Sequence, residues 1–286
     1  MDHRRPTLCV LDASSYVGLW VTKGLINRGY PVHAAVQKTG NPEIEKTIRE
    51  MGKVENGLVV LPVDIMDYQS ILVALKGCSG LFCCMDTPHV YDEKMVDLEV
   101  RGTINVVEAC ARTDTVEKIV FTSSLTAAVW RENILSEKDV DERCWSDKEF
   151  CRKMKLWYPL AKTLSEQAAW ALAMDRRLNM VSINAGLVLG PAVAEENSVS
   201  TISYLKVVDV KFLVDVHIRA MEDSSTGGRY FCFDQIVNSE DETVKLANTL
   251  RPLISIPPRC EGQGREGFAE RLRSRRLHKL IEGAAS

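Results

Sequence analysis

The sequence predicts an α/β fold, a doubly wound parallel sheet with helices on both faces, followed by a smaller C-terminal α+β lobe. Two observations lead to this prediction. Short apolar runs alternate with amphipathic helical segments through the first part of the chain, as in parallel sheets joined by right-handed crossovers. The chain has 286 residues, enough for one or two hydrophobic cores. We therefore expect a first domain over residues 1–184 and a second unit over residues 185–286.

Six strands and five helices are expected in the first domain. The strands are the short apolar runs Thr7–Leu11, Val32–Val36, Leu58–Val63, Gly80–Cys84, Lys118–Thr122 and Met180–Asn184. Apolar side chains at helical spacing predict the helices Tyr16–Arg28, Glu43–Met51, Tyr68–Leu75, Asp92–Thr113 and Trp157–Asp175. Residues that favour helix ends mark several boundaries: Gly29 after the first helix, Asn41 and Pro42 before the second, and Asp67 before the third.

The last third of the chain has a different pattern, which predicts a smaller lobe over the edge of the sheet. Its expected elements are a strand and helix in Asp209–Glu222, a strand Gly228–Phe233, a helix Glu240–Leu250, a loop Ile254–Pro258 and a basic helix Glu266–Ile281. The basic helix has two interpretations. It binds an anionic membrane or acidic partner, or it packs on its own domain with a solvated basic face, which we favour.

Composition excludes several classes of protein. The net charge of −3 argues against affinity built on phosphate neutralisation, so we expect no nucleic-acid partner. The first apolar run, Leu8–Leu11, is too short for a secretory signal, and no stretch resembles a bilayer span. Nine cysteines without zinc-ligand spacing predict reduced thiols, no metal and a cytoplasmic location.

A tyrosine and a lysine four residues apart carry the first chemical signal. Tyr158 and Lys162 share one face of a predicted helix. An ammonium near a phenol favours the phenolate and lowers the tyrosine pKa, which makes the phenol a usable acid. The same spacing also occurs by chance on helix surfaces. A hydroxyl at the end of the fifth strand, in Thr122–Ser124, would hold a substrate carbonyl for this tyrosine, and the combination is more specific than either part.

These features resemble the extended short-chain dehydrogenases/reductases, and more narrowly a divergent branch of the plant cinnamoyl-CoA reductase and dihydroflavonol reductase group. The resemblance runs from about residue 7 to about residue 250. The segments that carry it are Val120–Ser124, Cys144–Asp147 with Phe150 and Cys151, Trp157–Tyr158 with Lys162, Glu166–Trp170, Leu187–Pro191 and Gly228–Tyr230.

The resemblance implies a Rossmann domain followed by a substrate lobe, and a reductase that uses NADP(H) in preference to NAD(H). It implies that Ser124 polarises the carbonyl, that Tyr158 donates the proton, and that Lys162 lowers the tyrosine pKa and binds the nicotinamide ribose. The substrate would be a small molecule, an acyl-CoA thioester or related phenylpropanoid carbonyl of the kind used for lignin. The oligomeric state stays open.

The cofactor residues implied by the resemblance lie at the predicted strand ends. They are Asp12, Ser14, Ser15, Tyr16, Val17, Gly18, Gln37, Lys38, Asp64, Ile65, Cys84, Met85, Asp86, Tyr158, Lys162, Ala185, Gly186, Leu187 and Val188.

Several positions depart from the pattern of the family. Asp12 and Ser15 replace the first two glycines of the dinucleotide loop, and only Gly18 is kept. Gln37 stands where relatives place an arginine for the 2′-phosphate, although Lys38 follows it. The segment after Pro191 is short. These departures leave a second hypothesis open: a catalytically impaired nucleotide-binding or interaction protein on the same fold.

Overall fold

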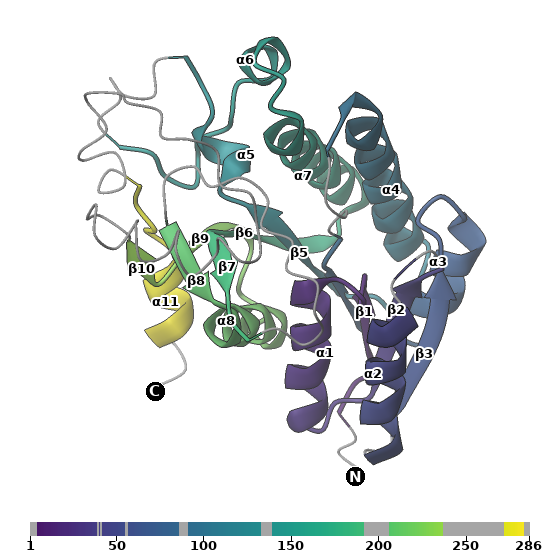
Figure 1. Cartoon of the computed structure of the whole chain (residues 1–286). Helices are drawn as coiled ribbons and strands as arrows, with labels where there is room; N and C mark the ends of the chain where they lie inside the picture. Colours follow the sequence, from purple (N-terminus) through teal and green to yellow (C-terminus); the bar gives the residue numbers. More distant parts are fainter. Residues whose placement is uncertain are drawn as a thin grey trace.

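A computed structural model (Figure 1) describes residues 5–38, 40, 42–54, 57–85, 91–132, 139–191, 206–236 and 272–282. The elements follow in the order β1 (Leu8–Leu11), α1 (Tyr16–Asn27), β2 (Val32–Gln37), α2 (Pro42–Val54), β3 (Leu58–Val63), α3 (Tyr68–Leu75), β4 (Gly80–Cys83), α4 (Glu93–Ala111), β5 (Lys118–Ser124), α5 (Thr126–Val129), α6 (Lys148–Lys153), α7 (Trp157–Arg176), β6 (Asn179–Ala185), β7 (Leu187–Leu189), β8 (Lys206–Asp209), α8 (Val210–Glu222), β9 (Gly228–Cys232), β10 (Gln235–Ile236) and α11 (Leu277–Glu282). The predicted α/β class is confirmed.

The large sheet has seven strands in the order β3-β2-β1-β4-β5-β6-β9, and every neighbouring pair is parallel. The strand order reverses between β1 and β4. In doubly wound sheets ligands bind outside the carboxyl ends of the strands at such a point. All six strands predicted for the first domain lie in this sheet.

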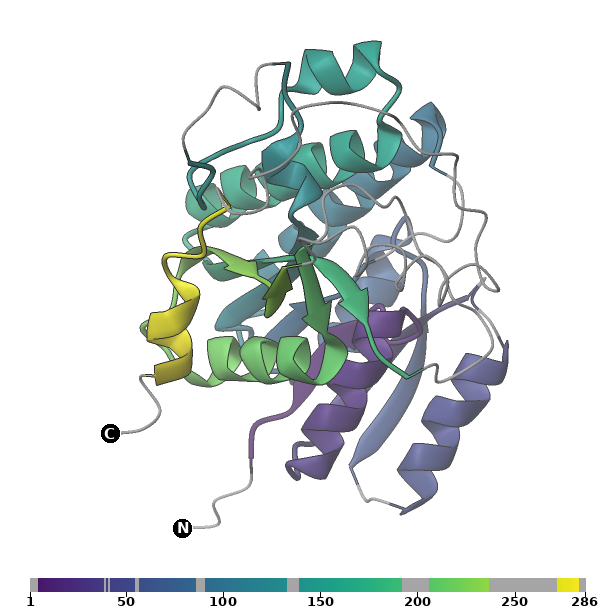
Figure 2. The same ribbon diagram turned by 60° about the vertical axis from the view of Figure 1, so that its left-hand side comes forward.

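Helices cover both faces of the sheet, which gives three layers (Figures 1 and 2). One core contains side chains of α1, α2 and α8, and the other contains side chains of α3, α4 and α7. Successive residues of a strand point to opposite faces, so Val10 belongs to the first core and Cys9 to the second. This alternation explains why the strands are apolar throughout.

The predicted helix ends at Gly29, Pro42 and Asp67 are confirmed, whereas α2 continues to Val54 instead of ending at Met51, and the predicted cap Asn41 lies outside the described residues. Ser15 caps α1 and accepts the N–H of Gly18, and Gly29 adopts φ +73° beyond its end. Asp67 caps α3. Pro159 occupies the first turn of α7, where the missing N–H costs nothing.

The chain after β6 differs from the expectation. Strand β9 pairs in parallel with β6 in the large sheet, whereas β7, β8 and β10 form a small second sheet. The division after residue 184 stays a prediction. The short helices α5 and α6 and the three-residue strand β7 were not predicted, because such short elements carry too few residues for a periodic pattern.

The C-terminal helix is shorter than expected in the described part. Helix α11 begins at Leu277, and its Leu277 and Leu280 side chains are buried. The expected helix 240–250 and loop 254–258 lie outside the described residues. No helix in the described ranges has the length and apolar character needed to cross a bilayer.

Candidate active site

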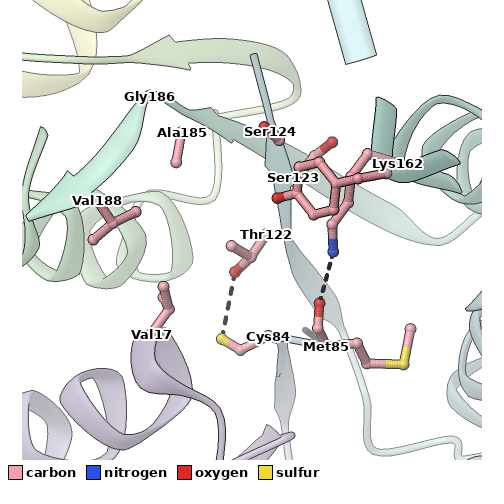
Figure 3. Close-up of a pocket in the computed structure, with 11 residues that line it drawn as sticks. Val17, Cys84, Met85, Thr122, Ser123, Ser124, Lys162, Ala185, Gly186 and Val188 are labelled. Atoms are coloured by element: carbon pink, nitrogen blue, oxygen red, sulfur yellow. Dashed lines mark hydrogen bonds between the residues drawn. The ribbon is translucent and has the colours of Figure 1, made fainter. Parts of the chain in front are cut away.

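A pocket opens at the carboxyl ends of β4, β5 and β6, beside the first turn of α1 (Figure 3). It is lined by Val17, Cys84, Met85, Thr122, Ser123, Ser124, Tyr158, Lys162, Ala185, Gly186 and Val188. The loop between β1 and α1, called the first loop below, is joined directly to the end of β4, because the Ser15 hydroxyl donates to the carbonyl of Cys84 at 2.7 Å. The strand ends thus meet at one edge, as expected.

The three predicted catalytic residues line this pocket together. Tyr158 and Lys162 lie in the first two turns of α7, and Ser124 ends β5. The ammonium of Lys162 lies 5.4 Å from the centre of the Tyr158 ring. The Ser124 hydroxyl oxygen accepts hydrogen bonds from the Thr126 amide at 3.2 Å and the Thr126 hydroxyl at 3.0 Å. These bonds fix the direction in which the Ser124 hydroxyl points.

Lys162 is buried and has partners that the sequence did not suggest. Its ammonium donates to the carbonyl of Met85 at 3.1 Å, as Figure 3 shows, and lies 3.3 Å from the carboxylate of Glu99 on α4. The other oxygen of Glu99 accepts the hydroxyl of Tyr91 at 2.6 Å. A signal for Glu99 exists in the sequence, since it lies at helical spacing from the apolar residues Val96 and Val106 and so falls on the buried face.

A second buried carboxylate anchors the end of β5. Glu166 is fully buried and accepts hydrogen bonds from Ser123, Ser182 and Asn184 at 2.6–2.8 Å. It also pairs with Arg229 of β9 at 2.8 Å. The amide of Asn184 donates to the carbonyl of Ser124 as well. The network therefore ties β5, β6, β9 and α7 together beneath the pocket.

Thr122 connects the pocket to a buried histidine on α8. His217 Nδ1 donates to the carbonyl of Leu213 at 2.8 Å, so its Nε2 accepts the Thr122 hydroxyl at 2.8 Å. Burial lowers the pKa of His217 to about 4, which keeps the ring neutral. Burial also raises the pKa of the neighbouring Cys84 thiol to about 12. Neither group carries charge near neutral pH.

The first loop is organised by its own side chains. Asp12 is buried, and its Oδ1 accepts the Ser14 backbone N–H at 2.8 Å and also the Ser14 hydroxyl. Gly18 is required for close packing, since a Cβ there would lie 1.9 Å from the carbonyl oxygen of Asp12. The Tyr16 hydroxyl donates to the carbonyl of Pro191 at 3.2 Å.

The remaining predicted cofactor residues that the structure describes do not line the pocket. Gln37 ends β2, and the ammonium of Lys38 pairs with Asp67 at 3.4 Å on the surface. Asp64 accepts the N–H of Met66 in the turn before α3. The buried Ile65 packs against Gly102 of α4, and Leu187 is half-buried in β7. Asp86 lies outside the described residues.

The residues at the switch point, where the strand order reverses between β1 and β4, fit a dinucleotide. The amides of Tyr16 and Val17 lie in the first turn of α1, where helical N–H groups lack an acceptor within the helix and favour an anion. The Ser14 amide is not available in the same way, because Asp12 accepts it. Across the described ranges, no cluster of histidine, cysteine or acidic side chains has the arrangement of a metal site.

Comparisons with known proteins show the family to which this sequence is similar. The sequence profile of the 3-beta hydroxysteroid dehydrogenase/isomerase family matches residues 9–199. Cinnamoyl-CoA reductase 1 of Petunia hybrida is 33% identical over 268 residues, which cover 88% of this chain and 80% of the relative.

Two solved structures share the fold of this chain. Vestitone reductase from alfalfa superposes with a TM-score of 0.73 at 22% identity, covering 96% of this chain and 92% of the relative. Gre2 of Candida albicans, solved in complex with NADPH, also gives a TM-score of 0.73, at 20% identity, covering 96% and 93% of the two chains. At these identities the likeness supports the fold alone.

Proposed function

The chain belongs to the 3-beta hydroxysteroid dehydrogenase/isomerase family and is similar to cinnamoyl-CoA reductases over most of its length, and on this premise we propose that it is an NADP(H)-dependent reductase. Its substrate would be an acyl-CoA thioester or a related phenylpropanoid carbonyl. One observation carries the proposal: Ser124, Tyr158 and Lys162, from two separate elements, line one pocket at the switch point of the sheet.

Each of these side chains has a role that its chemistry supports. The Tyr158 phenol donates a proton to the carbonyl oxygen, and the Ser124 hydroxyl holds that oxygen by a hydrogen bond. The positive charge of Lys162 favours the phenolate that remains. The nicotinamide, when bound, supplies the hydride. A thioester that gains the hydride at its carbonyl carbon and the proton at its oxygen becomes a hemithioacetal. The hemithioacetal then releases the thiol and leaves an aldehyde.

The choice between the two nicotinamide cofactors rests on the end of β2. Lys38 is the cation nearest in sequence to the position where the 2′-phosphate of NADP is expected, and it lies on the surface beside Asp67. We also propose the substrate lobe over residues 185–286 and a cytoplasmic location.

The test is a rate measurement with Tyr158→Phe. NADPH oxidation is followed with a hydroxycinnamoyl-CoA thioester and with a dihydroflavonol as alternative substrates. Loss of the general acid lowers the rate by ~10²–10⁴-fold, while NADPH binding stays nearly unchanged. Tyr68→Phe is the matched control, because Tyr68 lies on α3, does not line the pocket, and donates its hydroxyl to the carbonyl of Glu108 at 3.5 Å. Equal rates for the protein and Tyr158→Phe would contradict the proposed acid.

A non-catalytic nucleotide-binding or interaction protein is the second candidate. The observation that favours it is the Asp12 carboxylate, which occupies the Ser14 amide in the loop where a pyrophosphate would bind. Failure to bind NADPH and NADH at millimolar concentration would make this candidate the better one.

A further inference from the structure

A buried acidic side chain, Glu99, lies beside the proposed site and has no part in the chemistry proposed so far. It projects from α4 and is 3% exposed. One of its oxygens lies 3.3 Å from the ammonium of Lys162, and the other accepts the hydroxyl of Tyr91 at 2.6 Å. A carboxylate buried to this extent needs such partners, because its desolvation is costly.

The partners of Glu99 both lead to the same ring. The ring of Tyr91 meets the ring of Tyr158 edge to face, with centroids 4.9 Å apart. The other partner of Glu99, the Lys162 ammonium, lies 5.4 Å from the centre of the Tyr158 ring. Tyr158 is therefore connected to Glu99 in two ways, one through an ion pair and one through an aromatic contact.

The charge balance around Tyr158 depends on this carboxylate. Lys162 and Glu99 are both nearly inaccessible, at 5% and 3% exposure, so water screens their charges weakly. Among the described residues, the titratable groups that face the pair include Tyr91, Tyr158 and Cys83 of β4, and burial raises the pKa of the Cys83 thiol, which stays neutral. The ammonium alone favours a phenolate at Tyr158, whereas the ammonium paired with a carboxylate does so less strongly.

We propose that Glu99 is a positioning residue of the active site, which holds the Lys162 ammonium against Met85 and offsets its charge, so that Tyr158 keeps its proton to higher pH. Its catalytic meaning rests on the proposed reductase function, because a proton donor must be protonated at the working pH. The effect on Tyr158 itself does not depend on turnover.

A purely structural role is the competing explanation, since the pair also joins α4 to α7. The chain offers a matched control for it. Glu108 lies on the same helix and pairs with Arg176 of α7 at 2.7 Å, remote from the pocket residues in sequence and near the surface. Glu108→Gln therefore removes an ion pair between the same two helices without changing the charge beside Tyr158.

The test measures the ionisation of Tyr158 directly. Phenolate absorbance is titrated in the full chain without added cofactor, and the curve of the corresponding Tyr158→Phe variant is subtracted. With Glu99→Gln, which keeps the size of the side chain, Tyr158 is expected to ionise about one pH unit lower. With Glu108→Gln the midpoint is expected to stay where it is. An unchanged midpoint in folded Glu99→Gln would overturn the proposal.

Two further measurements complete the test. If Glu99→Gln does not fold, Glu99→Asp keeps the charge and withdraws it from the ammonium, and an unchanged Tyr158 midpoint there overturns the proposal equally.

The pH profile of NADPH oxidation is the second measurement, and its alkaline limb should move in the same direction as the titration. A shifted titration with no turnover in any variant would reject the reductase and keep the Glu99 assignment. Turnover with an unshifted titration would keep the reductase and reject the Glu99 assignment.

Discussion

Asp12 turns back onto its own loop, where its carboxylate accepts the backbone N–H of Ser14 at 2.8 Å. In this position it uses one of the amides that an anion at the N-terminus of α1 would bind. The carboxylate also opposes a pyrophosphate directly, since two like charges ~5 Å apart repel by roughly 3 kcal/mol at an effective dielectric constant near 20.

Removing this carboxylate is expected to tighten dinucleotide binding. Asp12→Gly, alone or with Ser15→Gly, should lower the dissociation constant of NADPH by ~10-fold or more, because one decade corresponds to about 1.4 kcal/mol. Ligand fluorescence titration measures it. Asp147→Gly, which removes the aspartate that caps α6 instead, is the control. If the restored loop binds no better than the native one, the native turn already fits the cofactor.

Because Lys38 pairs with Asp67, we expect substitutions of these two residues to change NADPH binding in opposite directions. Asp67→Asn keeps a capping side chain on α3 and releases the Lys38 ammonium, so NADPH should bind about threefold more tightly. Lys38→Met should weaken NADPH binding by a similar factor. NADH binding, measured in parallel, should change in neither variant. Equal effects on both cofactors would show that Lys38 does not contact the 2′-phosphate.

His217 predicts a loss of stability in mild acid. Burial lowers its pKa to about 4 from about 6.5 in the unfolded chain. Between these values the unfolded state binds the proton and the folded state does not, so stability falls as the pH falls. The loss contributed by this residue reaches roughly 2 kcal/mol at pH 4.5.

Urea unfolding at pH 7 and pH 4.5 measures this effect as a difference between variants. His217→Gln should lose roughly 2 kcal/mol less on acidification than the native chain. His278→Gln, which changes an exposed histidine of α11, should behave like the native chain. Identical pH dependence in the native chain and His217→Gln would mean that the ring is already protonated in the fold.

Arg229 predicts a large cost for breaking the buried network. Its guanidinium stacks on Trp145, with its central carbon 3.8 Å from the ring centre, and pairs with the fully buried Glu166. Arg229→Met leaves that carboxylate without a cation and should lower the free energy of unfolding by ~3–5 kcal/mol. Arg176→Met breaks the more exposed pair with Glu108 and should cost less than about 1 kcal/mol. Similar costs in urea unfolding would argue against the network.

Much of the fold could be predicted because its signals are local. A strand of four to seven apolar residues and a helix with apolar side chains at helical spacing are each specified within one short segment. The cap at Asp67 and the left-handed residue at Gly29 depend only on adjacent atoms. The assignment of β9 to the large sheet could not be found this way, since an apolar strand has the same pattern in either sheet.

The candidate site also has a part that the sequence could predict and a part that it could not. The spacing of Tyr158 and Lys162 places them on one face of α7, and the position of Ser124 at a strand end brings it to the same edge. The lines of contact from Lys162 to Glu99 and from Thr122 to His217 join residues 63 and 95 positions apart. No spacing rule links such residues.

The sequence by itself determined the parallel sheet, the helix boundaries and the edge at which the pocket lies, because hydrogen bonding and side-chain direction within one element follow from neighbouring residues. Only the tertiary structure decided that the Lys162 ammonium is paired with a buried carboxylate and that Asp12 accepts the Ser14 amide. The physical reason is that a buried charge takes whichever partner the packing of separate elements brings within ~3–4 Å. That partner depends on how α4 packs against α7 and not on the order of residues in either helix.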